Sequence, residues 1–128
     1  MVTPTLIHHV ALECSDVQSA DLFFSNVLGI PKVKSTMLSA ELCASIFQVD
    51  RSVQMETYDN GRMRVEVFIT PEPVPLRFVH VGIAVESKTD FVARCQQQGL
   101  APFFVEKNGK QLLFVRDFCG NLFEVVEQ

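Results

Sequence analysis

The sequence predicts an α+β fold made of two similar modules, each of the form βαβββ. Three observations predict this fold: a short apolar strand followed by a capped helix occurs twice, turn residues divide the rest of each half into strands, and a proline-rich stretch separates the halves. The chain has 128 residues, which fits one domain. We therefore expect a single domain over 1–128, with the first module at 5–70, a linker at 71–76 and the second module at 77–128.

The duplicated strand and helix carry the clearest part of the repeat. One strand begins at His9 and its counterpart begins at His80, each within a short apolar run. A helix-capping pattern follows each strand, starting at Ser15 and at Ser87. Each helix is expected to end at a glycine, which lies 20 positions after the histidine in the first half and 19 positions after it in the second. The two halves therefore agree in register.

Each half then continues as three strands. They are expected near 43–49, 52–58 and 63–69 in the first half, and near 102–107, 111–116 and 121–127 in the second. Turn residues at 59–61, 108–109 and 117–120 separate them. The linker contains Pro71, Pro73 and Pro75, and this density of proline favours an extended, stiff connector over another strand.

Charge and composition exclude several classes of protein. The net charge is −4, with 20% charged and 48% hydrophobic residues, which excludes a disordered polyelectrolyte and a basic protein that binds nucleic acid. No apolar run reaches the ~18 residues of a membrane span and no secretory signal is visible, so we expect a cytoplasmic protein that does not enter a membrane. The four cysteines lack metal-site spacing, and we expect them to be reduced apolar fillers.

Alternation along the strands places two histidines and two carboxylates on the open faces of the sheets. His9 is expected to share a face with Glu66, and His80 with Glu124. A carboxylate within an apolar strand is costly to bury unless it is paired or binds a metal. Taken singly, each residue also has a purely structural interpretation, but the matched pairs in both halves favour one shared explanation. Two imidazoles and two carboxylates suit a divalent transition metal, with room for water or substrate oxygens.

Four further residues are candidates for substrate binding. Arg64 and Arg116 are placed to hold an anionic group, the alternative for each being a solvated or ion-paired arginine. Phe68 and Phe78 face the open side of their strands and are candidates to line an apolar pocket. His8 is expected to face the helix and to be structural. The remaining aromatic residues of interest are interpreted as core: Phe23, Phe24, Phe103, Phe104, Phe114 and Phe123.

Five segments of the chain resemble the vicinal oxygen chelate superfamily, which includes glyoxalases, bleomycin-resistance proteins and extradiol dioxygenases. The matching segments are 9–12 with Asp16, 23–31, 65–67, 80–83 and 116–124, and they span nearly the whole chain. The resemblance implies paired βαβββ modules that curl into a half-barrel around a metal, and it implies a homodimer. The sequence leaves open whether the modules pair within one chain or between two.

The set of metal ligands is most similar to that of glyoxalase I. The resemblance implies a divalent metal held by His9, Glu66, His80 and Glu124, for which nickel, zinc, cobalt and iron are all compatible. It implies a lyase or isomerase that acts on a small 2-oxo compound or its thiol adduct through an enediolate-like intermediate. Glu124 and Glu66 are then the catalytic carboxylates, with Glu124 moving a proton at the carbon next to a carbonyl.

Two departures from glyoxalase I argue against glutathione as the thiol. Glu13 stands where that family usually has an arginine for glutathione, and a carboxylate there would repel the glutathione carboxylate. Thr70 stands where the family usually has an asparagine. The alternatives are an isomerase similar to methylmalonyl-CoA epimerase and a metal-free binding protein of the bleomycin-resistance type. A ring-cleaving dioxygenase or thiol transferase is disfavoured, because Glu66 would occupy a position that those chemistries leave open.

Overall fold

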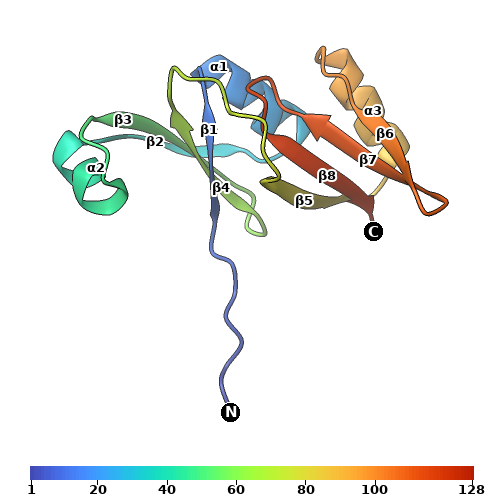
Figure 1. Ribbon diagram of the computed structural model, residues 1–128, viewed down its shortest axis with the longest axis horizontal. Coiled ribbons are helices and arrows are strands. Elements are labelled where there is room, and N and C mark those ends of the chain that lie inside the picture. The colour runs from blue at the N-terminus through green and yellow to red at the C-terminus, as the bar shows by residue number, and fades with distance from the viewer.

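The computed structural model describes residues 1–128 as two four-stranded mixed sheets (Figure 1). The first sheet has the order β1 (Val10–Cys14), β4 (Arg64–Ile69), β3 (Val53–Asp59) and β2 (Lys32–Leu38). The second has the order β5 (His80–Val85), β8 (Leu122–Glu127), β7 (Lys110–Arg116) and β6 (Phe103–Lys107). In each sheet the first and last strands of the module run parallel as neighbours, and the other pairs are antiparallel. This arrangement confirms the predicted α+β fold of two repeated modules.

One helix follows the first strand of each module, as predicted. Helix α1 (Val17–Ala20) continues directly into the π-helical segment η1 (Asp21–Val27), and α3 (Lys88–Gln97) is its counterpart. The Ser87 hydroxyl accepts a hydrogen bond from the Asp90 N–H at 3.1 Å and caps α3. In the first module the cap lies one residue later than predicted, because the Asp16 carboxylate accepts from the Ser19 N–H at 2.7 Å.

The segment between η1 and β3 differs from the prediction. The prediction of a strand near 43–49 is wrong, because helix α2 (Ala40–Phe47) covers most of this range. The Ser39 hydroxyl accepts the Leu42 N–H at 3.1 Å, and this cap starts a helix in a sequence too short to show helical periodicity clearly. Strand β2 was not predicted, because its residues are mostly exposed and show no apolar alternation.

A single hydrophobic core joins the two modules. The rings of Phe23 in η1 and Phe123 in β8 have their centroids 4.9 Å apart, so the first module's helix packs directly on the second module's sheet. Phe23, Phe24 and Phe123 are fully buried, as predicted. The prediction was wrong for Phe103 and Phe104, which are 42% and 53% exposed, because β6 is an edge strand with no layer covering it. Phe114 is partly buried and stacks on Phe103.

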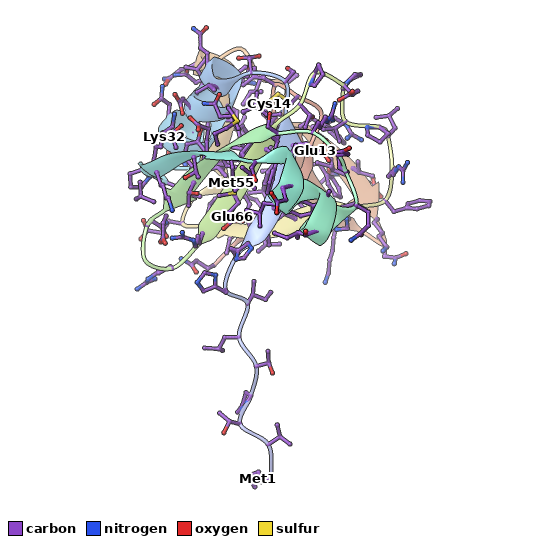
Figure 2. The ribbon with its side chains drawn as sticks, turned by 90° about the vertical axis from the view of Figure 1, so that its left-hand side faces the viewer. Met1, Glu13, Cys14, Lys32, Met55 and Glu66 are labelled. Carbon is purple, nitrogen blue, oxygen red and sulfur yellow. A yellow bond between two sulfur atoms is a disulfide. The ribbon has the colours of Figure 1, made fainter.

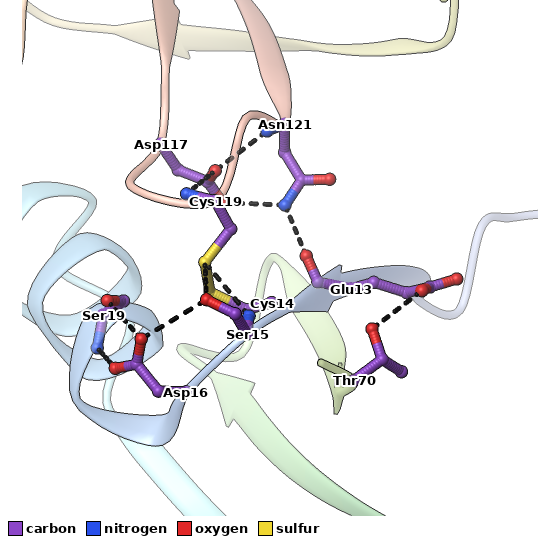
Figure 3. Close-up of a disulfide and its surroundings, with 9 residues drawn as sticks. All are labelled: Glu13, Cys14, Ser15, Asp16, Ser19, Thr70, Asp117, Cys119 and Asn121. Atoms are coloured by element: carbon purple, nitrogen blue, oxygen red, sulfur yellow. Dashed lines mark hydrogen bonds between the residues drawn. A yellow bond between two sulfur atoms is a disulfide. The ribbon is translucent and has the colours of Figure 1, made fainter. Parts of the chain in front are cut away.

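A disulfide links the end of the first strand to the second module (Figure 3). Cys14 at the end of β1 is bonded to Cys119 in the turn before β8, so the expectation of four reduced cysteines is wrong for these two. Their separation of 105 positions gives no local spacing signal, and only the fold brings them together. Cys43 and Cys95 are buried free thiols, as expected for apolar fillers, and burial raises the pKa of Cys95 to about 11.

The N-terminal residues before His9 extend away from the two sheets (Figures 1 and 2). His8 is therefore exposed. The expectation that it faces a helix is wrong. Its Nδ1 atom lies 2.8 Å from Nδ1 of His9, so one of the two rings donates a hydrogen bond to the other. No helix of the structure combines the length and apolar character needed to cross a membrane.

Candidate active site

The first predicted pair lies on neighbouring strands of the first sheet. Strand β1 runs parallel to β4 with Ala11 opposite Glu66, and His9 lies just before β1 on the same side. His9 Nε2 is 3.3 Å from Glu66 Oε1, and both side chains are partly exposed. The strand alternation thus brings these two side chains together as predicted.

The second predicted pair has the same geometry in the second module. Strands β5 and β8 run parallel with Gly82 opposite Glu124, and His80 Nε2 lies 3.7 Å from Glu124 Oε1. A Cβ atom added to Gly82 would meet no atom within 4 Å, so the surface beside Glu124 is open. A molecule from solvent therefore has free access to this carboxylate.

The hydrogen bond of His80 fixes which of its nitrogens can bind a cation. Nδ1 of His80 lies 2.7 Å from the carbonyl oxygen of Phe78, and because a carbonyl only accepts, Nδ1 is the donor. The Nε2 lone pair of the neutral ring then faces the Glu124 carboxylate. Two lone pairs at this distance repel each other unless a proton or a metal ion lies between them. The pair is therefore suited to hold a cation, and the residue types suit a divalent metal.

Within one chain the four residues form two separate pairs. No group of three or more His, Cys, Asp or Glu side chains converges on one point of the chain. Each module thus offers one imidazole nitrogen and one carboxylate, which is half of the predicted ligand set.

A cavity of about 250 Å³ lies further along the same face of the first sheet as the His9–Glu66 pair, and neither residue of the pair lines it. Ala11 is opposite Glu66 in the strand register and lines the cavity, as does Phe68, two residues further along β4. Helix α2 closes the cavity on one side, and its Phe47 ring packs edge-on against Phe68 at 5.5 Å between centroids. The complete lining is Ala11, Leu12, Glu13, Cys43, Phe47, Val49, Arg51, Val53, Phe68 and Thr70.

The sequence prediction found only part of this cavity. Phe68 was predicted to line a pocket, and it does. Phe47 and Arg51 were missed, because the segment that carries them was interpreted as strand when α2 and the turn after it form the wall. The capping serine at Ser39, followed by an acidic residue in the first turn, is the signal that could have identified α2.

The other three candidates for substrate binding occupy different surroundings. Arg64 forms an ion pair with Asp59 at 2.8 Å, as in the structural alternative, and it lines neither this cavity nor the next. Arg116 lines a second cavity of about 360 Å³ at the junction of the modules, with His80 and the linker, and donates to the Gly120 carbonyl at 2.9 Å. Phe78 is 98% exposed and lines neither cavity.

Residues at the module junction hold the end of β1 in place (Figure 3). The Glu13 carbonyl accepts a hydrogen bond from the Asn121 side-chain amide at 2.7 Å, and the Glu13 carboxylate accepts one from the Thr70 hydroxyl at 3.0 Å. Asp117 orders the turn by accepting from the N–H groups of Cys119 and Asn121. Burial raises the pKa of Asp117, and these hydrogen bonds oppose that rise without cancelling it.

Solved structures match this arrangement over nearly the whole chain, although neither a protein-family model nor a curated protein matches the sequence. A glyoxalase family protein from Bacillus cereus aligns with a TM-score of 0.75 at 19% identity, over 99% of this chain and 97% of that one. A glyoxalase family protein from Enterococcus faecalis aligns with a TM-score of 0.70 at 22% identity, over 94% of this chain and 95% of that one. The chain has the glyoxalase fold.

Fosfomycin resistance proteins share the glyoxalase fold. FosX from Listeria monocytogenes aligns with a TM-score of 0.74 at 12% identity, over 97% of this chain and 94% of that one. A variant of that protein has been crystallised with Mn(II) and 1S,2S-dihydroxypropylphosphonic acid. The resemblance to the vicinal oxygen chelate superfamily is thus confirmed in the fold, and proteins of the glyoxalase fold include one that binds a divalent metal and a small molecule.

Proposed function

We propose that the protein is a metal-dependent lyase or isomerase that acts on a small 2-oxo compound or its thiol adduct. The observation that carries this proposal is the repetition of one His–Glu pair per module at equivalent strand positions, with Nε2 directed at a carboxylate oxygen in both. A structural role for these residues would not require the same pair twice. The open surface beside Glu124 supports access by a substrate.

His9, Glu66, His80 and Glu124 are the residues that would hold the metal. A divalent ion at this position would supply Lewis acidity toward two adjacent oxygens of the substrate. Nickel, zinc, cobalt and iron suit two imidazoles and two carboxylates, and manganese joins them as an ion to test because FosX binds it. The bond from His80 Nδ1 to the Phe78 carbonyl keeps the other ring nitrogen directed at the site.

Two copies of the chain are proposed to complete each site. Within one chain the two pairs do not converge, so each copy supplies one pair to a shared site. The residues just before β1 and β5 support this arrangement, because they are large, apolar and largely exposed: Leu6, Ile7, Leu76, Phe78 and Val79. Contact between two copies at these segments would bury that surface beside both histidines. A two-fold symmetric homodimer would contain two such sites.

Glu124 is proposed to take a proton from the carbon next to the substrate carbonyl and to return it to the neighbouring carbon. A carboxylate in this role contributes roughly 10²–10⁴-fold to the rate. Proton transfer at a carbon next to a thioester would use the same residue, so an epimerase remains the closest alternative reaction. Substrate panels should therefore contain both 2-oxoaldehyde adducts and acyl-CoA epimers.

Metal content of the purified, untagged protein tests the proposal. We expect one tightly bound divalent ion per chain in the wild type and none in the His9→Ala, His80→Ala double variant. Glu106→Ala is the control, since Glu106 is an exposed carboxylate on β6 outside both pairs and its removal should leave the metal content unchanged. If the wild type takes up no nickel, cobalt, zinc, iron or manganese, the enzyme proposal is wrong and a metal-free binding protein is favoured.

A further inference from the structure

The cavity on the same face as the His9–Glu66 pair has an uncompensated negative charge. Its ionised lining residues are Glu13 and Arg51. Both terminal nitrogens of Arg51 lie 3.5 Å from the Glu72 carboxylate, so a neighbouring acid already offsets the arginine charge. Glu13 makes no ion pair, and its carboxylate receives only the Thr70 hydroxyl. Arg77 and Arg116 line the second cavity, which Glu13 also borders, but neither places a nitrogen within 4 Å of the Glu13 carboxylate.

The backbone at Glu13 is held by contacts on both sides, and the Thr70 hydroxyl orients its carboxylate. Its own carbonyl is held by Asn121, and the next residue, Cys14, is held by the disulfide and by a bond from the Thr70 N–H to its carbonyl at 2.9 Å. Figure 3 shows the Glu13 side chain directed at Thr70, away from the disulfide. A charged acceptor that is already ordered loses little entropy when it binds a partner.

The rest of the cavity is apolar and partly aromatic. Seven of its ten lining residues are hydrophobic, and two of them, Phe47 and Phe68, are aromatic rings packed edge-on against each other. A cation near such rings is attracted by their negative faces, which adds to the attraction of Glu13. The volume of about 250 Å³ lies below the ~300–1,000 Å³ of sites for drug-sized ligands, so the cavity suits a ligand about the size of one substituted ring.

We propose that this cavity binds the apolar, amine-bearing part of a small organic cation, with the ammonium group at Glu13 and the apolar body against Phe47 and Phe68. This inference rests on the proposed function, because it makes that cation the substrate of the adjacent site. Phe68 and Thr70 lie two and four residues beyond Glu66 on the same face. At about 3.3 Å per residue, the reacting oxygens and the ammonium group would therefore be roughly 7–13 Å apart. A substrate with an anionic tail is disfavoured by the same carboxylate.

Ligand binding to metal-free protein tests the inference. The protein is stripped of metal with a chelator and titrated with 2-phenylethylamine and with its neutral counterpart 2-phenylethanol, using calorimetry or backbone amide shifts. We expect the wild type to bind the amine at least tenfold more tightly than the alcohol, with a preference that decreases as salt is added. Equal binding of the two compounds would overturn the inference.

Three variants distinguish the contribution of the Glu13 charge to ligand binding from that of the apolar wall. Glu13→Gln keeps an acceptor for Thr70, so it should fold normally, lose the tenfold preference and leave alcohol binding unchanged. Phe47→Ala should weaken the binding of both compounds, and that of the amine somewhat more, because the ring also attracts the cation. Glu41→Gln is the matched control, because Glu41 lies on α2 outside the cavity and its loss should change neither affinity. A preference for the amine that survives in Glu13→Gln would contradict the role of Glu13.

The experiment distinguishes this inference from the proposed function. Because it measures binding in the absence of metal, loss of the amine preference would leave the metal-content result untouched. Conversely, failure of the protein to take up metal would not alter the expected preference of the cavity. The two claims therefore stand or fall on different measurements.

Discussion

The two modules share a strand frame but differ on their open faces. Both have a parallel pair of strands that carries one histidine and one glutamate. Only the first module has a helix, α2, between its second and third strands, and that helix closes the cavity on the same face as Glu66. The second module instead connects β6 and β7 by a two-residue turn at Asn108 and Gly109 and leaves Phe103 and Phe104 exposed.

This difference assigns the two tasks of the proposed active site, the chemistry and the choice of ligand, to different features of the fold. The repeated element supplies the proposed metal ligands twice, so the chemistry belongs to the duplicated part of the fold. The inserted helix occurs once and closes the cavity, and the residue that matches Glu13 in the second module is Ala84, so the choice of ligand belongs to features that the two modules do not share. Changes in the shared pairs should therefore affect turnover, whereas changes around α2 should affect affinity.

The largest expected effect comes from replacing Glu124, one of the two glutamates at matching positions in the modules. Glu124→Gln should lower kcat by about 10²–10⁴-fold, because an amide cannot accept the proton. The variant should remain folded, since Glu124 is partly exposed and its only ion-pair partner is His80. Turnover of candidate 2-oxo substrates, with circular dichroism as the control for folding, measures this effect. Full activity in the variant would exclude Glu124 as the base.

The junction between the modules should contribute the largest single effect on stability. The Cys14–Cys119 bond closes a loop with a separation of 105 positions. Replacing both cysteines by serine should lower the free energy of unfolding by about 4 kcal/mol, because the unfolded chain gains the freedom that the bond removes. Denaturant unfolding with and without reductant measures it. Reductant should destabilise the wild type and leave the double variant unchanged; an unchanged wild type would contradict the bond's role.

A smaller effect is expected at the ion network that ties β2 to β3, the strands that flank α2. Glu56 is buried and accepts hydrogen bonds from Lys32 and Ser35, and Lys32 also pairs with Asp21 at 2.8 Å. The second module has no lysine or arginine ion pair of its own. Lys32→Met should lower the free energy of unfolding by about 2 kcal/mol at neutral pH. This is less than the 3–5 kcal/mol lost when a fully buried pair is broken, because the Lys32 side chain is 29% exposed.

The same network predicts a pH dependence with a definite sign. Burial alone would raise the pKa of Glu56, but the hydrogen bonds from Lys32, Ser35 and Gln54 outweigh it and lower the pKa below the ordinary 4.5. The stability that Glu56 contributes is therefore complete above pH 4.5 and is lost as the pH falls through the lowered value. The stability difference between wild type and Lys32→Met should shrink below pH 4.5, and a difference that grows in acid would contradict this account.

The smallest effect tests the balance of charge around the cavity. Glu72→Gln removes the partner of Arg51, so the free guanidinium should weaken the binding of 2-phenylethylamine by about two- to fivefold, in line with the ~0.2–1 kcal/mol of an exposed pair. The binding of 2-phenylethanol should not change. The same titration used for Glu13→Gln measures it, and unchanged amine binding in Glu72→Gln would show that Arg51 does not act on the cavity.

Much of the shared frame could be predicted from the sequence. The apolar runs at His9 and His80, the capping serine at Ser87 and the turn glycines all have local causes, so their patterns are visible in the chain. The His–Glu pairs could be predicted for the same reason, because strand alternation fixes which side chains share a face once the strands are known.

Among the features that were missed, only α2 had a local signal in the sequence, and the others depend on tertiary contacts. Strand β2 shows no apolar alternation, and α2 is a short helix whose existence rests on the cap at Ser39. The Cys14–Cys119 bond joins residues that only the packing of the two modules brings together. Whether the two pairs converge within a chain is likewise set by how the modules pack, which strand patterns do not contain.

The central claim is that two copies each supply one His–Glu pair to a shared metal site. Co-expressing the His9→Ala and His80→Ala chains with different tags, and purifying the mixed dimer through both tags, tests it directly. In such a dimer one site retains both histidines and the other loses both, so the account predicts one tightly bound metal ion per mixed dimer and none in either variant alone. No metal in the mixed dimer, while the wild type binds one ion per chain, would contradict it.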